Sequence, residues 1–220
     1  LKDLELEGYN ILPNANTIEI TMNRKKIRDL AANICKCNTT KYEYVSSIDK
    51  LLNKINIIGL PCVIKPLMSS SGKGQTILKD INQMKKAWLY AIENSRGNIN
   101  EIIIEEFLSF DYEFTLMTIY YNKNICFLEP IIHIQENGDY LISYQPFKLD
   151  NILLKQAQLY CKNIINKLCS STDKGIFGFE FFVKNNIIYF NEVAPRPHDT
   201  AMVTLSSQLY SQFSIYSRII

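Results

Sequence analysis

Hydrophobic residues along the chain follow two spacings, one typical of strands and one typical of helices. Apolar runs rich in β-branched and aromatic residues predict strands at 42–45, 62–64, 102–104, 110–121, 179–183 and 187–190. Apolar residues at helical spacing predict helices at 21–30, 48–55, 81–92, 151–168 and 202–220, the first with Thr21 as its N-cap. Short turns at 122–124, 137–138 and 184–186 predict hairpins between neighbouring strands.

The hairpin within 178–200 carries carboxylates that its apolar pattern does not require. Glu180 lies inside the first strand, and Glu192 lies at the end of the second. A buried carboxylate costs several kcal/mol unless it is paired or bound to a metal. Each glutamate alone is explained by an edge position or a lysine partner, but the pair predicts a metal site.

The two glutamates face one way only if their strands have a suitable register. A three-residue loop at 184–186, or a bulge, gives that register. A two-residue turn at Asn185-Asn186 without a bulge would place Glu180 opposite Asn191 and turn Glu192 to the other face. We predict the first arrangement. Beyond this hairpin lie Arg196, His198 and Asp199, in a loop that Pro195 and Pro197 stiffen, and their charges suggest an adjoining substrate pocket.

A candidate phosphate site lies earlier in the chain. Lys65 ends a buried strand, and the loop Ser69-Ser70-Ser71-Gly72-Lys73-Gly74-Gln75 follows closely. Serines and glycines let backbone N–H groups surround phosphate oxygens, while lysine offsets their charge. The loop lacks the glycine–lysine spacing of a Walker A motif. A Ser/Gly turn alone is a weak signal, and Lys65 strengthens it.

Other polar groups carry weaker signals. The local sequence predicts that Arg24 is a solvent-exposed charge in the first turn of the helix at 21–30. Glu105 to Leu108 follow a buried strand and resemble a hinge whose main chain pairs with adenine. Glu113 either holds a ribose hydroxyl or pairs with a lysine.

Composition narrows the class of protein. The 220 residues are 47% hydrophobic and 21% charged, with a net charge of +2 and no basic block. These values are ordinary for a globular protein and give no argument for a nucleic-acid or membrane partner. The six cysteines are scattered and have no zinc or thioredoxin spacing, so we predict reduced thiols in a cytoplasmic protein.

The order of Lys65, the Ser/Gly loop, the 105–108 hinge and the paired glutamates resembles the ATP-grasp fold. That fold implies an α+β chain in which two subdomains with antiparallel sheets and flanking helices clamp ATP. The stretches MSSSGKGQT (68–76), PIIHIQENGDY (130–140) and NEVAPRPHDTAMVTL (191–205) resemble formate-dependent phosphoribosylglycinamide formyltransferases. The chain departs from that family at Ile134, Ile142, Tyr144 and Ala201.

The resemblance implies roles for individual residues. It implies that Arg24 and Lys65 contact ATP phosphates and that Glu113 holds the ribose. The resemblance assigns further groups to the phosphate loop (Ser70, Ser71, Gly72, Lys73, Gly74, Gln75), the adenine (Glu105, Glu106, Phe107, Leu108), Mg²⁺ (Glu180, Glu192) and the ribonucleotide (Asp199). On charge grounds, Arg196 is placed beside formyl phosphate as a catalytic group.

The implied reaction is ATP- and Mg²⁺-dependent formylation of glycinamide ribonucleotide by formate, through formyl phosphate. Two alternatives remain open: a carboxylase of the aminoimidazole ribonucleotide type, and a nucleotide-binding fragment without turnover. We predict that residues 1–20 are the segment that exits a missing N-terminal domain. Residues 21–106 are predicted to form the small lid subdomain with its leading helix, and residues 107–220 the central subdomain with the metal site. The full-length protein is expected to be a cytoplasmic homodimer without nucleic-acid or membrane partners.

Overall fold

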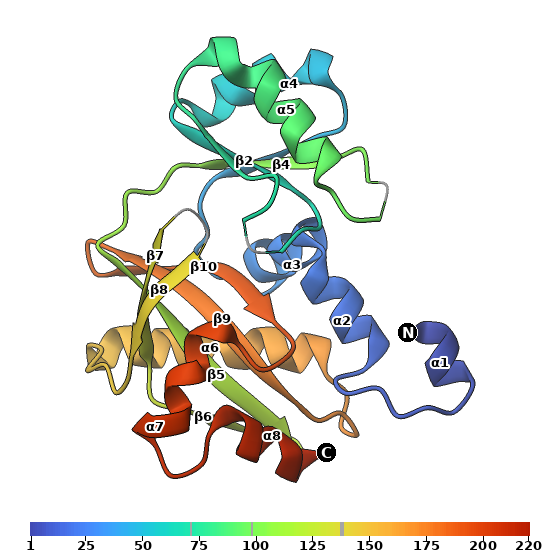
Figure 1. Ribbon diagram of the computed structural model, residues 1–220, viewed down its shortest axis with the longest axis vertical. Helices are drawn as coiled ribbons and strands as arrows, with labels where there is room; N and C mark the ends of the chain where they lie inside the picture. Colours follow the sequence, from blue (N-terminus) through green and yellow to red (C-terminus); the bar gives the residue numbers. More distant parts are fainter. Residues whose placement is uncertain (71, 98, 137–138) are drawn as a thin grey trace.

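The computed structural model describes residues 1–70, 72–97, 99–136 and 139–220. Its strands form two antiparallel sheets, which are separated along the long axis of the molecule in Figure 1. The arrangement confirms the α+β class with flanking helices. The predicted turn at Asn137-Gly138 lies outside the described residues.

The smaller sheet has the strand order β1-β4-β2-β3. Its strands are β1 (Tyr42–Val45), β2 (Cys62–Pro66), β3 (Thr76–Leu78) and β4 (Ile102–Glu106). Two helices, α4 (Ile48–Ile58) and α5 (Met84–Glu93), pack on it, and a 3₁₀ turn (Ile81–Gln83) precedes α5. Leu51, Ile55 and Trp88 contribute to the shared core, so this half buries its own apolar face.

The larger sheet has the order β10-β9-β5-β7-β8, with β6 paired to β5. Its strands are β5 (Tyr112–Tyr121), β6 (Asn124–Phe127), β7 (Ile131–Glu136), β8 (Asp139–Tyr144), β9 (Gly175–Lys184) and β10 (Ile187–Ala194). Helix α6 (Asn151–Leu168) packs against this sheet (Figure 1) and confirms the predicted helix at 151–168. Phe179, Phe181 and Phe190 are fully buried between them.

The N-terminal part forms α1 (Lys2–Leu6), α2 (Ala15–Met22), α3 (Arg24–Asp29) and a π-helical turn (Leu30–Ile34). The prediction of Thr21 as an N-cap was wrong, because Thr21 lies inside α2 and donates to the Thr17 carbonyl at 2.7 Å. Asn23 caps α3 instead, accepting from the N–H groups of Lys25 and Lys26. Arg24 therefore occupies the first position of α3.

The segment after Asn23 packs with the larger half. Ile27, Ala31, Cys35 and Cys37 join the core beneath the larger sheet, although the sequence grouped 21–106 with the smaller one. Helix α3 thus lies between the two halves (Figure 1). The division into 1–20, 21–106 and 107–220 stays a prediction.

The C-terminal part is broken where the sequence predicted one helix at 202–220. It forms a 3₁₀ turn, η3 (Asp199–Val203), and the helices α7 (Thr204–Ser207) and α8 (Gln212–Ile219). Gln208 is extended, and the Ser211 side chain caps α8. The break lets the Gln212 side chain bond both the N–H and the carbonyl of His198. No described helix is both long and apolar enough to cross a membrane.

Candidate nucleotide and metal site

A cavity of about 1300 Å³ is lined by residues of both sheets, α2 and α3. It brings together most of the residues that the sequence selected. Those on its lining are Arg24, Lys65, Ser70, Gly72, Gln75, Glu105, Glu106, Phe107, Leu108, Glu113, Glu180, Glu192, Arg196 and Asp199. Lys73 and Gly74 are not on the lining, and Ser71 lies outside the described residues.

The hairpin of β9 and β10 brings the two predicted metal ligands together through a bulge. Asn185 and Asn186 have φ values of 50° and 59° and form a two-residue turn, with Lys184 paired to Ile187. The register shifts between Phe190 and Glu192, so that Glu192 pairs with Glu180. The extra residue is Asn191. The bulge, and not a three-residue loop, sets the predicted register.

Glu180 is held by three neighbouring side chains. Its Oε1 accepts from the Tyr140 hydroxyl at 2.7 Å and lies 3.1 Å from His198 Nε2. Its Oε2 accepts from the Asn191 amide at 3.2 Å. Burial by itself would raise the pKa of Glu180, but the hydrogen bond and charge of His198 and the Tyr140 bond outweigh it and lower the pKa. Glu180 therefore stays a carboxylate.

Glu192 is the more accessible partner. Its side chain is 44% exposed, and its Oε2 lies 3.5 Å from Arg24 Nη2. Arg24 also donates to the Pro66 carbonyl and to Ser69 Oγ, each at 3.0 Å. Because Asn23 caps α3, Arg24 points toward the Ser/Gly loop and Glu192. The local sequence had instead favoured a solvent-exposed Arg24.

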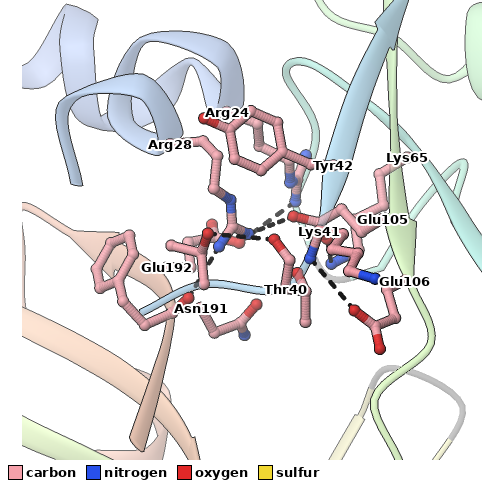
Figure 2. A network of polar contacts seen from close by, with 12 residues as sticks. Arg24, Arg28, Thr40, Lys41, Tyr42, Lys65, Glu105, Glu106, Asn191 and Glu192 are labelled. Atoms are coloured by element: carbon pink, nitrogen blue, oxygen red, sulfur yellow. Dashed lines mark hydrogen bonds and ion pairs between the residues drawn. The ribbon is translucent and has the colours of Figure 1, made fainter. Parts of the chain in front are cut away.

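Figure 2 shows the network of polar contacts around Arg28, Glu105 and Lys65. Lys65 Nζ lies 2.5 Å from Glu105 Oε2, and Arg28 contacts the other oxygen of Glu105. Burial by itself would raise the pKa of Glu105, but the charges of Arg28 and Lys65 lower it from 4.5 to about 2. The carboxylate of Glu105 is therefore an ionic partner of Lys65 as well as part of the predicted adenine hinge.

Two hydrogen bonds and a glycine shape the Ser/Gly loop that is predicted to bind phosphate. Lys73 N–H donates to the Ser70 carbonyl and Gln75 N–H to the Gly72 carbonyl. Gly74 has a φ of 76°, and a Cβ there would lie 2.6 Å from Pro66 Cγ, so this position requires glycine. Arg96, which the sequence did not single out, donates to Ser70 Oγ at 2.8 Å.

Apolar groups and Glu113 line another part of the cavity. Phe107 and Leu108 follow β4, and the rings of Phe110 and Phe182 stack with centroids 4.5 Å apart. Gln135 donates to Glu113 at 3.4 Å, and His133 Nε2 lies 3.5 Å from the same oxygen. The neighbours of Glu113 are therefore the Gln135 amide and the His133 imidazole. The sequence had predicted either a ribose hydroxyl or a lysine as its partner.

Arg196 and Asp199 lie on the cavity wall contributed by the loop after β10. Both are exposed, and Arg196 Nη1 donates to the Pro197 carbonyl at 2.8 Å. Three residues of the β7–β8 hairpin differ from those usual in the family that the sequence resembles. Ile142 lines the cavity, whereas Ile134 and Tyr144 do not.

Sequence reasoning missed several residues of the site: Arg28, Arg96, Tyr140, Asn191 and His198 as partners of the selected groups. Asn191 had a local signal, because an amide directly before Glu192 becomes a second polar group on the same side once a bulge is present. Arg28 had one too, since it follows Arg24 by four residues and so lies on the same helix face. Tyr140 and His198 approach Glu180 only through tertiary packing.

The residues present fit a magnesium ion. Mg²⁺ prefers oxygen ligands and commonly uses one or two carboxylates together with substrate phosphates. Glu180 and Glu192 are paired across the bulge and both line the cavity. Within 1–70, 72–97, 99–136 and 139–220, no three His, Cys, Asp or Glu side chains form a metal cluster. Two carboxylates that would share the ion with a phosphate group fit the ligand preference of Mg²⁺. They also explain why those ranges contain no cluster of three such side chains.

Comparison with known proteins places this geometry in a family. The model of the ATP-grasp domain matches residues 30–213. Formate-dependent phosphoribosylglycinamide formyltransferase of Prochlorococcus marinus (strain MIT 9301) is 48% identical over 99% of this chain and 55% of its own. The chain thus spans about half the length of the curated relatives it matches.

Two solved structures share the fold. The ADP complex of purK, N5-carboxyaminoimidazole ribonucleotide synthetase, has a TM-score of 0.84 at 25% identity, over 99% of this chain and 56% of that one. Glycinamide-RNase-transformylase T from Mycobacterium tuberculosis has a TM-score of 0.78 at 24% identity, over 100% and 58%. The matched domain covers most of the cavity's residues, and the chain belongs to the ATP-grasp family.

Proposed function

We propose that this chain binds Mg-ATP and transfers its γ-phosphoryl group to formate, within an enzyme that formylates glycinamide ribonucleotide in purine biosynthesis. The observation that carries the proposal is the pairing of Glu180 with Glu192 in a cavity whose lining also includes Lys65 and Arg24. Carboxylates suit the metal, and the two cations suit phosphate oxygens. The choice of formate is supported by the names of relatives at 48% identity.

Each part of the cavity has a role in the proposal. Lys65, Arg24 and the loop from Ser70 to Gln75 hold the phosphates, and Glu105 to Leu108 receive the adenine. Glu113 holds the ribose, while Asp199 contacts the ribonucleotide and Arg196 lies beside the transferred formyl group. Phosphoryl transfer requires mainly positioning and charge stabilisation, which these residues supply.

Glu180 and Glu192 would hold Mg²⁺, which when bound offsets negative charge on the transferring phosphoryl group. The protein's own contribution is to hold the two carboxylates in place. Tyr140, His198 and Asn191 fix Glu180, while the bulge fixes Glu192 opposite it.

The proposed chemistry has two balanced steps. A formate oxygen forms a bond to the γ-phosphorus as the bond to the ADP oxygen breaks, giving formyl phosphate and ADP. The glycinamide amine then attacks the formyl carbon, phosphate leaves, and the amine loses a proton. Because formyl phosphate reacts with water, a loop that covers the phosphates would protect it.

The wider setting is also proposed. We infer a cytoplasmic enzyme whose longer form is a homodimer, with formate and glycinamide ribonucleotide as substrates and without nucleic-acid or membrane partners. Relatives about twice as long contain further sequence that would complete the ribonucleotide pocket.

The test compares co-substrates. The chain, alone and within the longest product of its gene, is incubated with Mg-ATP and formate or bicarbonate, with and without the matching ribonucleotide. We expect formate-dependent ADP release and formylated glycinamide ribonucleotide. Bicarbonate-dependent release would favour the carboxylase that the structural likeness to the synthetase also suggests. Nucleotide binding without ADP release would favour a binding fragment.

A further inference from the structure

Helix α3 carries two arginines one helical turn apart, and they have different surroundings. Arg24 lines the cavity, whereas Arg28 is 4% exposed and is not on the lining. Residues four positions apart lie on one face of a helix, so both arginines point from α3 toward the gap between the two sheets. Figure 2 shows them side by side, with Arg28 between the Glu105 and Glu192 regions.

The guanidinium of Arg28 joins groups from both sheets. Its Nη1 donates to the Phe190 carbonyl at 2.8 Å, and Nη2 contacts Glu105 Oε1. Phe190 is the last paired residue before the bulge of β10, and Glu105 belongs to β4. One rigid fork thus links the smaller sheet to the strand segment that presents Asn191 and Glu192.

The link continues to Lys65, the cation that we propose binds phosphate. Glu105 uses one oxygen for Arg28 and the other for Lys65. Glu105 is 3% exposed, and the Lys65 side chain 13%, so solvent screens these charges little. A lysine side chain has many rotamers, and an ionic partner that is itself held in place restricts them.

We infer that Arg28 is a positioning residue: by holding Glu105 and the Phe190 carbonyl together, it fixes Lys65 relative to the carboxylate pair. The inference rests on the proposed binding of Mg-ATP. Arg28 is not on the cavity lining, so its role is indirect. Its effect passes through Glu105 to Lys65 on one side and through the β10 backbone to Glu192 on the other.

The charge balance of the cluster agrees with this role. Glu105 contacts two cations, Arg28 and Lys65, so these three side chains together carry one positive charge. Without Arg28, Glu105 would neutralise Lys65 alone and reduce its attraction for phosphate. With Arg28 present, Lys65 keeps a fixed position and the cluster keeps a net charge that favours an anion.

The test is a double-mutant cycle read by calorimetry with MgADP. Arg28→Lys keeps the charge, but a single ammonium lacks the planar fork that reaches both partners. We expect Arg28→Lys to weaken MgADP binding about tenfold in the wild-type background and less than about twofold in the Lys65→Ala background, because interacting residues are not additive. Adenosine, which lacks phosphates, should bind both Lys65-containing proteins equally.

Lys25→Met is the matched control. Lys25 belongs to the same helix but pairs with Glu101 at 2.8 Å and is 41% exposed, so MgADP affinity should stay within about twofold. Circular dichroism and thermal unfolding check that each variant is folded. Arg28→Met, which removes both the charge and the fork, is a second variant and should weaken MgADP binding at least as much as Arg28→Lys; if Arg28→Met does not fold, Arg28→Lys carries the test.

Two outcomes contradict the inference in different ways. A folded Arg28→Lys protein that binds MgADP as tightly as wild type, or weakens it equally in both backgrounds, overturns the positioning role alone. A wild-type chain that does not bind MgADP overturns the proposed function, and the inference with it.

Discussion

The two glutamates of the candidate metal site have different surroundings, so their substitution should affect the fold to different degrees. Glu180 is enclosed by Tyr140, His198 and Asn191, so replacing it would remove a bonding partner from all three side chains. Glu192 is half-exposed and has one distant cationic neighbour. Glu192 is thus the residue at which function can be removed with little change to the fold.

We expect Glu192→Ala to abolish Mg-ATP turnover, with a loss in kcat of at least about 100-fold, as for other groups that stabilise transition-state charge. Its loss should cost at most about 1 kcal/mol of folding free energy, because the Glu192 side chain is 44% exposed and lies 3.5 Å from Arg24. Steady-state ADP release measures the first and urea unfolding the second. Glu93→Ala, an exposed change at the end of α5, is the control. Wild-type turnover in Glu192→Ala would refute the metal role.

Lys65→Ala should weaken ATP binding by about tenfold or more, because a charge-assisted bond to phosphate is lost. Calorimetry gives the dissociation constant directly. Lys79→Ala removes an equally charged but exposed side chain just after β3 and should leave the constant unchanged. An unaltered constant in Lys65→Ala counts against the assigned phosphate contact.

Asp199→Asn should raise the KM for the ribonucleotide by about tenfold while ATP affinity is preserved, because only a charged contact to the second substrate is weakened. Asp199 is exposed on the cavity wall, so the fold should be unaffected. The measurement is a pair of KM values in the longest gene product. If ATP affinity alone changes, the residue has been misassigned.

At this scale the sequence identified residues whose chemistry is unusual for their position. Glu180 and Glu192 were recognised because carboxylates are rare in apolar strands, and Lys65 because it ends one. Arg28 was missed because an arginine on a helix looks like surface charge, and its burial depends on two sheets that meet only in the folded chain.

At the scale of elements, turn geometry decides where side chains are presented. Within the residues that the structure describes, two hairpins use two-residue turns with positive φ at both positions: Asn122 and Lys123, and Asn185 and Asn186. Such turns match the twist of the strands but strain residues other than glycine and asparagine. In the second hairpin the turn fixes the register up to the bulge, and the bulge then places Glu192 opposite Glu180.

Lys123→Gly should stabilise the chain by about 1 kcal/mol, because glycine adopts the φ of 65° without strain. The same change at Lys155, an exposed position inside α6, should destabilise it by about 1 kcal/mol. Urea unfolding of both variants measures the two effects. A loss of stability in Lys123→Gly would contradict the turn assignment.

Element prediction succeeded where one strong pattern acts alone and failed where tertiary contacts choose the boundary. The helix 151–168 has a long apolar stripe and an aspartate cap, and both bounds were right. Thr21 and Asn23 are both plausible caps, and packing of α2 against α6 at the Leu168 carbonyl selected Asn23. The segment 202–220 was read as one helix because its apolar spacing hides the break that His198 and Gln212 require.

The whole molecule consists of two sheets with separate cores, joined at α3 by buried charges. Glu105 is central to that junction, since it contacts a cation from each side. Its pKa is about 2 in the folded chain against an ordinary 4.5. A carboxylate with a lowered folded pKa contributes stability above pH 4.5 and loses it as the pH falls toward 2.

Glu105→Gln should therefore lower the free energy of unfolding most at neutral pH, by about 3–5 kcal/mol, because Arg28 and Lys65 lose their shared partner. The difference from wild type should shrink as the pH falls from 4.5 toward 2. Urea unfolding across that range measures it. Glu101→Gln, at a partly exposed pair, should show a small and nearly constant difference. A constant gap for Glu105→Gln would contradict the buried ionic junction.

The central claim is that Glu180 and Glu192 together hold a divalent ion at the nucleotide's phosphates, within reach of Lys65. A crystal of the chain with Mn²⁺ and ADP, examined by anomalous scattering, tests it most directly. We expect one manganese peak about 2.0–2.6 Å from an oxygen of each glutamate and from a phosphate oxygen. Nucleotide bound in the cavity with manganese absent from both carboxylates would contradict the claim.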